Sequence, residues 1–62
     1  MADYDVWLVH QYWTWYTAFY AESREDVWNL IPMRLQEEGL PSWFVTDAQE
    51  IKIEEAGTVT PL

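Results

Sequence analysis

The segment from residue 4 to residue 21 constrains the fold most, because most of its side chains are aromatic or β-branched. Such residues suit the pleated, half-buried surface of a β-strand. As one extended strand the segment would reach about 60 Å, which is longer than a domain of 62 residues. We therefore predict two strands joined by a hairpin, and we place the reversal at His10 and Gln11, the least apolar point of the segment.

Alternation along the second strand sorts its side chains into two faces. We expect the more apolar face to line the core, so that the aromatic residues hold the small fold together from inside. That face comprises Trp13, Trp15, Thr17, Phe19 and Ala21. The opposite face comprises Tyr12, Thr14, Tyr16, Ala18 and Tyr20. In the first strand, the buried pair is either Val6 with Leu8 or Trp7 with Val9.

Residues 23–38 have the pattern of an amphipathic helix. Ser23 is a good N-cap, and Asp26 at the third helical position comes close to a capping box. The apolar stripe consists of Val27, Leu30, Ile31 and Leu35. Gly39 is well placed as the C-terminal cap. Pro32 has no amide hydrogen to donate, so we expect a kink there or a first helix that ends near Leu30.

Residues 42–55 predict a return to β structure. An apolar piece, 43–46, and an alternating piece, 50–54, form either one long strand with a bulge at 47–49 or a second hairpin. Residues 56–62 have the composition of a frayed tail. The fold class that follows is α+β, in the order ββαβ. Residues 1–62 form one domain, a small antiparallel sheet of three or four strands with one helix packed on one face.

Charge excludes several classes of function. Eleven acidic and three basic residues give a formal net charge of −8. Such a chain repels nucleic-acid phosphates and anionic membrane surfaces, so we expect it to bind neither directly. The charge favours a basic protein as partner and electrostatically steered association. The acidic N-terminus is unlike a signal peptide, and the longest uncharged run is too short to span a membrane, which predicts a cytoplasmic protein.

Catalytic chemistry finds little support in the sequence. His10 is the sole histidine and there is no cysteine, so a metal site lacks its usual ligands. The paired acids of the predicted helix are sequence neighbours that diverge around it. We also expect these acids to be exposed, whereas a general acid needs burial to raise its pKa. We predict no enzyme activity, no metal and no cofactor.

Two sets of side chains are candidates for contact with a partner. The tyrosine stripe comprises Tyr12, Tyr16 and Tyr20, and protein interfaces favour such stripes. The acidic set comprises Glu22, Glu25, Asp26, Glu37, Glu38, Asp47, Glu50 and Glu54. Surface carboxylates can imitate a run of phosphates and occupy a cationic groove, although Lys52 interrupts the last run. Aromatic rings also stack on sugars, which leaves a sugar-binding module as a further alternative.

One stretch of the chain resembles a known family. The matching pieces are Phe19 to Ser23, Glu25, Leu30, Gly39 and Phe44-Val45, within roughly residues 13–47. They are similar to the small RNA-polymerase inhibitor of lytic podophages, in which a strand leads to a capped acidic helix, a glycine and an aromatic-led strand. The resemblance implies a similar ββαβ fold and a small phage-type inhibitor of a host enzyme. The basic residues of that family's last strand are replaced here by Thr46, Asp47, Gln49 and Glu50, so the resemblance implies the class of inhibitor and not the same target surface.

The sequence therefore leads to a hypothesis and an alternative. The hypothesis is a non-enzymatic protein that occludes a basic, nucleic-acid-handling surface of a host enzyme, such as a polymerase, nuclease or immune effector, in the host cytoplasm. The alternative is an assembly module that self-associates through aromatic edge strands, as a homodimer or as a subunit of a larger particle.

Overall fold

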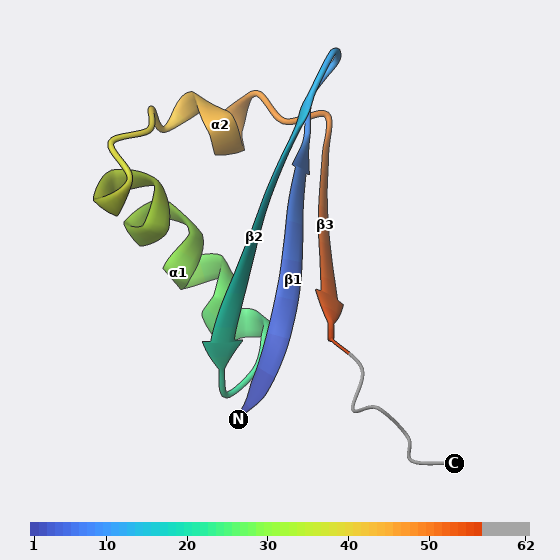
Figure 1. Cartoon of the computed structure of the whole chain (residues 1–62), viewed down its shortest axis with the longest axis vertical. Coiled ribbons are helices and arrows are strands. Elements are labelled where there is room, and N and C mark those ends of the chain that lie inside the picture. The colour runs from blue at the N-terminus through green and yellow to red at the C-terminus, as the bar shows by residue number, and fades with distance from the viewer. Residues whose placement is uncertain (57–62) are drawn as a thin grey trace.

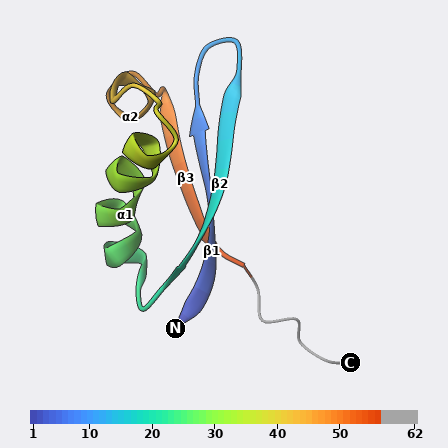
Figure 2. The same cartoon turned by 60° about the vertical axis from the view of Figure 1, so that its left-hand side comes forward.

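Three antiparallel strands and one long helix dominate the computed structural model, which describes residues 1–56. The elements are β1 (Ala2–Val9), β2 (Thr14–Ala21), α1 (Arg24–Glu37), α2 (Trp43–Thr46) and β3 (Glu50–Glu55). The strands lie in the order β2-β1-β3, so the N-terminal strand is central. Both helices lie on one side of the sheet and leave its other face uncovered (Figure 1, Figure 2). The predicted α+β fold with one helix packed on one face is confirmed.

The chain reverses between β1 and β2 where the sequence placed the hairpin. Val9 pairs with Thr14, and the four residues between them form the turn. The His10 N–H donates to the Trp13 carbonyl oxygen at 2.8 Å and closes this turn. From there the register continues to Ala2 opposite Ala21, so almost the whole aromatic segment is paired.

The core is mainly aliphatic, which corrects the expectation that tryptophans hold the fold together. Its buried residues are Tyr4, Val6, Leu8, Phe19, Ala21, Val27, Ile31, Leu35 and Ile53. Val6 and Leu8, and not Trp7 and Val9, are thus the buried pair of β1. None of the five tryptophans, all within the described residues, is buried, and three of them are at least 40 % exposed. One helix on three short strands leaves an interior that medium-sized side chains fill, so the large indole rings lie at its margin.

The predicted core face of β2 is therefore only partly correct. Thr17, Phe19 and Ala21 are buried against α1, as expected. Trp15 is half-buried, and Trp13 belongs to the hairpin turn, beyond the area that α1 covers, where it packs on α2 instead. The alternation sorted the strand correctly, but α1 is too short to cover its first residues.

Local capping signals set both ends of α1. The Ser23 Oγ accepts from the Asp26 N–H at 3.3 Å, which satisfies a free amide of the first turn. At the other end Gly39 has a φ of 71°, and the Leu40 N–H donates to the Leu35 carbonyl oxygen at 2.8 Å. This 6→1 bond, with the Gly39 N–H donating to Gln36, is a Schellman motif.

The helix continues through Pro32, so the expectation that it ends near Leu30 is wrong. Pro32 and Trp28, four residues earlier, both lie on the exposed side of α1. The Trp28 carbonyl that loses its helical donor therefore faces solvent, where water can replace the missing bond. Tertiary packing of Val27, Ile31 and Leu35 holds the helix together across this point.

The prediction of β structure across residues 42–55 is wrong for Trp43–Thr46, which form the short helix α2. The Asp47 N–H donates to the Trp43 carbonyl oxygen at 2.9 Å and closes this helical turn. The rings of Trp43 and Phe44 lie 6.0 and 4.9 Å from the Trp13 ring. Packing at the hairpin tip thus overrides the local β propensity of the segment.

β3 pairs with β1 on the side away from β2, which gives a sheet of three strands. The Ala56 N–H donates to the Asp3 carbonyl oxygen at 2.8 Å, so residue 56 is still bound to the sheet and not part of a frayed tail. The rest of that predicted tail, 57–62, lies outside the described residues. Within residues 1–56, neither helix has the length and apolar character needed to cross a bilayer.

Candidate partner-binding surface

The uncovered side of the sheet, which we call the open face, gathers acidic and aromatic side chains. Because Tyr4, Val6 and Leu8 point toward α1, alternation places the intervening residues on the other side. The open face consists of Asp3, Asp5, Trp7 and Val9 of β1, Thr14, Tyr16, Ala18 and Tyr20 of β2, and Glu50, Lys52 and Glu54 of β3. It is the one side of the sheet that neither helix covers (Figure 2).

An aromatic row crosses the middle of the open face. The register sets Trp7 between Tyr16 and Lys52. The rings of Trp7 and Tyr16 lie 5.5 Å apart at an angle of 47°, and the Lys52 Nζ lies 5.5 Å from the Trp7 ring centroid. This row provides flat apolar area of the kind that protein interfaces use at their centre.

Carboxylates lie beside this row with little to neutralise them. Asp5 is directly opposite Glu54, and two like charges in facing positions of a sheet repel. Asp3 is on the same face as Asp5, about 7 Å along the strand. The Lys52 Nζ lies 3.8 Å from the Glu54 Oε2, but both side chains are more than half exposed, so this pair contributes little stability. The open face keeps an excess of negative charge.

The Tyr16 hydroxyl joins the aromatic row to the carboxylates by donating to the Asp5 Oδ1 at 2.6 Å. This hydrogen bond raises the pKa of Tyr16 above its ordinary value, and desolvation and the charge of the same carboxylate add to the effect. Tyr16 therefore remains a neutral donor at physiological pH, and the Asp5 carboxylate is oriented by it.

Both arginines are engaged on the helix side of the sheet and leave the open face unopposed. The Arg24 Nη2 donates to the Ile53 carbonyl oxygen at 2.7 Å, at the edge of β3. The Arg34 Nη1 donates to the Thr17 Oγ1 at 2.6 Å, and its guanidinium lies 4.6 Å from the Phe19 ring centroid. Lys52 is thus the one cation on the open face among the residues that the structure describes.

The structure brings the predicted contact residues together only in part. Those on the open face are Tyr16, Tyr20, Glu50 and Glu54. Those elsewhere are Tyr12 at the hairpin tip, Glu22, Glu25 and Asp26 around the start of α1, Glu37 and Glu38 at its end, and Asp47 after α2. The length of α1 separates its two acidic ends by about 20 Å, so the predicted acidic set is not one continuous surface.

Two acidic residues of this surface, Asp3 and Asp5, were not predicted as contacts. The sequence carries part of their signal, because Asp3 and Asp5 alternate with Tyr4 and Val6, but the apolar Trp7 and Val9 leave the buried face of the strand open. The packing of Val6 and Leu8 under α1 settles that face and places both carboxylates on the same side as Trp7.

His10 forms a separate feature at the hairpin tip, where it is only 8 % exposed. Its ring stacks on the Trp13 ring with 4.0 Å between centroids, and the ring centroids of Trp43 and Phe44 lie about 6 Å away at steep angles. Neither ring nitrogen has a hydrogen-bond partner among the described residues. Within residues 1–56 no cluster of three metal-ligating side chains is found. The observed contacts of His10 are those of a flat ring packed among aromatic rings.

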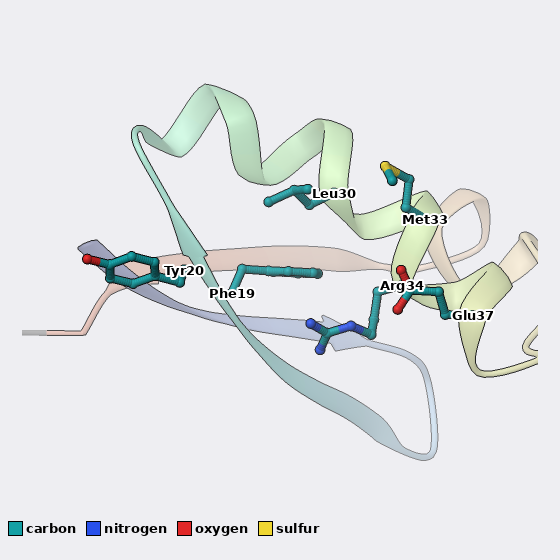
Figure 3. A pocket seen from close by; sticks show the side chains of 6 residues that line it. All are labelled: Phe19, Tyr20, Leu30, Met33, Arg34 and Glu37. Carbon is teal, nitrogen blue, oxygen red and sulfur yellow. The ribbon is translucent and has the colours of Figure 1, made fainter. Parts of the chain in front are cut away.

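Two hollows lie beside α1. One, of about 170 Å³, opens between α1 and the outer edge of β2 (Figure 3). The other, of about 200 Å³, lies between the end of α1 and α2 and is lined mainly by apolar groups, including Leu35, Leu40 and Val45. Both have the size of a side chain or two and not of an enclosed substrate site.

Comparison with known proteins gives no relative from which a role can be transferred. The chain matches no protein-family model, no curated protein and no solved structure. The resemblance to podophage polymerase inhibitors therefore stays a prediction, and the open face is the feature on which a function can be based.

Proposed function

We propose that the chain is a non-enzymatic binding protein whose open face docks onto a basic surface of a partner protein. The observation that supports this is that Asp5 and Glu54 lie next to the Trp7–Tyr16 pair on the one uncovered side of the sheet, with Asp3 further along the same face. Carboxylates of this kind steer a basic partner and set orientation, whereas the aromatic row provides desolvated contact area.

Enzymes that handle nucleic acids are the partner class that fits this surface. Their grooves present Arg and Lys side chains spaced to meet phosphates. On the open face, carboxylates lie about 5 Å apart between strands and about 7 Å apart along a strand, and can meet the same cations. Docking would block the groove, which is inhibition by occlusion. A phage-type inhibitor of a host polymerase, nuclease or immune effector is the form of this proposal that the podophage resemblance favours.

The test is affinity capture from host lysate at low and high salt, with two double variants of equal charge. Asp5→Asn with Glu54→Gln removes two charges from the open face. Glu22→Gln with Glu25→Gln removes two charges near the start of α1, and both of these side chains are exposed. We expect a target that the wild type and the helix variant retain and the open-face variant loses, with affinity that falls as salt rises. The purified target should also lose nucleic-acid binding when the chain is added.

Two outcomes would contradict the proposal. Equal loss of the target by both variants would mean that net charge, and not the open face, drives capture. A target held equally at high salt, or one that binds nucleic acid in the presence of saturating chain, would exclude occlusion of a basic groove.

Self-association is a second candidate function, because β2 is an edge strand without a charged residue. Two copies paired through β2 would form a continuous sheet of six strands. Sedimentation at several salt concentrations separates the two candidates. A dimer that is insensitive to salt and shows no affinity for basic proteins would favour assembly.

A further inference from the structure

The outer edge of β2 presents a row of backbone groups that the sheet does not use. Because the His10 N–H bonds to Trp13, alternation directs the backbone of Trp15, Thr17 and Phe19 toward β1. The N–H and carbonyl groups that point outward belong to Thr14, Tyr16, Ala18 and Tyr20. Within residues 1–56 no strand lies on that side. The Arg34 Nη1 donates to the Ala18 carbonyl oxygen at 3.3 Å, which shows that this carbonyl points away from β1.

The two edges of the sheet are protected differently. β3 has Glu50, Lys52, Glu54 and Glu55 among its six residues, and charge of this kind discourages pairing with another chain. β2 has no charged residue among its eight, although the whole chain has a net charge of −8. Arg34 covers only the carbonyl of Ala18. β2 is thus the edge that is left open to an added strand.

A strand added to β2 would meet different surroundings on its two sides. On the helix side it would run along the hollow of about 170 Å³, which is lined by Phe19, Tyr20, Leu30 and Met33 and by the charged side chains Arg34 and Glu37 (Figure 3). Met33 is 55 % exposed there, an apolar side chain without cover. Every second side chain of an added strand would point toward this hollow, so apolar residues fit the positions beside Phe19, Leu30 and Met33. The Arg34 guanidinium is already held there by Thr17 and Ala18.

On the other side, the alternate side chains would lie next to Tyr16 and Tyr20. On the neighbouring strand β1, Asp5 accepts a hydrogen bond from the Tyr16 hydroxyl, and Asp3 lies opposite Tyr20. Tyrosine rings attract cations over their faces, and the two carboxylates strengthen that attraction. Lys and Arg side chains fit these positions.

We propose that an extended segment of the basic partner, alternating apolar residues with Lys or Arg, adds to β2 as a fourth strand. This inference rests on the proposed function and specifies how the partner is held. Charge favours a basic segment over a second copy of the chain. Pairing two copies would bring together two net charges of −8 through a strand that has no basic residue.

The probe is a short, blocked peptide of alternating valine and lysine, measured by isothermal titration calorimetry and by amide exchange. Ala18→Pro removes an outward N–H without removing a bond to β1, because proline is tolerated at such positions of edge strands. Ala18→Val is the matched control and keeps the N–H. We expect the control to bind as the wild type does, and Ala18→Pro to bind about tenfold more weakly or worse. Bound peptide should protect the Thr14 and Tyr16 amides from exchange.

A modified peptide gives the same test without altering the protein. Two peptides carry N-methyl groups on alternate amides, one on the odd-numbered and one on the even-numbered residues. Only in one of them do the methylated amides face β2, and that peptide cannot donate the hydrogen bonds of an added strand. One of the two methylated peptides should lose binding and the other should keep it. This version remains decisive if Ala18→Pro fails to fold.

The outcomes separate this inference from the proposed function. Peptide binding that is unchanged in Ala18→Pro and in both methylated peptides, but lost in the Asp5→Asn, Glu54→Gln variant, overturns strand addition and leaves the open face as the docking site. No binding of the peptide to the wild type overturns strand addition, whereas lysate capture still tests the open face. A dimer without peptide that Ala18→Pro disperses would identify a second copy as the occupant and overturn the basic segment.

Discussion

Tyr16 and Asp5 are diagonal neighbours on adjacent strands, and a hydrogen bond of 2.6 Å joins the tyrosine hydroxyl to the aspartate carboxylate. Diagonal positions of an antiparallel pair lie close enough for an aromatic side chain to reach across. The bond makes the aromatic row and the carboxylates of the open face one surface with a fixed arrangement. Its consequences can be measured directly.

Asp5→Asn should lower the pKa of Tyr16 toward its ordinary value of about 10, because the carboxylate that raises it is gone. The folded-state pKa of Tyr16 is raised above the unfolded value. Its contribution to stability is therefore fully present below about pH 10 and is lost as pH rises through the folded pKa. Tyrosinate absorbance during an alkaline titration, compared with Tyr16→Phe, isolates this group. An unchanged Tyr16 titration in Asp5→Asn would show that the bond is not formed in solution.

His10→Phe should raise the free energy of unfolding by about 1 kcal/mol, because it removes two buried ring nitrogens that lack partners. Phenylalanine keeps a flat ring that can stack on Trp13. Urea denaturation followed by tryptophan fluorescence measures the change. His10→Ala is the control and should destabilise, because it also removes the stack. If His10→Phe destabilises as much as His10→Ala, the nitrogens have partners in solution.

Pro32→Ala should stabilise the protein by about 1–3 kcal/mol, because it restores an amide donor inside α1 at an exposed position. The control is Gln36→Ala, also exposed and one turn later, which should change stability by less than about 0.5 kcal/mol. Thermal and urea unfolding of the three proteins give the comparison. A loss of stability in Pro32→Ala would mean that the proline ring makes contacts that outweigh the missing hydrogen bond.

Gly39→Ala should destabilise by about 1–2 kcal/mol through backbone strain alone. The φ of Gly39 is 71°, and an added Cβ would meet no atom within 4 Å. Gly39→Asn should destabilise the protein less than Gly39→Ala does, because asparagine tolerates the left-handed conformation better than alanine. Equal unfolding midpoints for glycine and alanine at this position would show that the Schellman motif opens without cost.

Local signals in the sequence determined the elements whose residues interact with near neighbours in the chain. The alternation of β2 and both caps of α1 are such features, since Ser23 and Gly39 act within one helical turn. The hairpin followed instead from the length of the aromatic segment, which is too long for one strand. The tyrosine side of the open face was predictable for the same reason. Strand alternation fixes which side chains share a face without reference to the rest of the fold.

The tertiary structure decided everything that depends on distant contacts. Residues 43–46 have β propensity, yet they form α2 because Trp43 and Phe44 pack on His10 and Trp13. β1 is the central strand, and its Val6 and Leu8 are buried against α1. Because side chains alternate along a strand, Asp3 and Asp5 therefore lie on the open face. The sequence alone thus determined which residues alternate and which residues cap α1, whereas packing of Val27, Ile31 and Leu35 decided that the helix continues through Pro32. Which face of β1 is buried, and which carboxylates meet across strands, was decided by burial of apolar area between elements far apart in the chain, an energy that no local window of sequence contains.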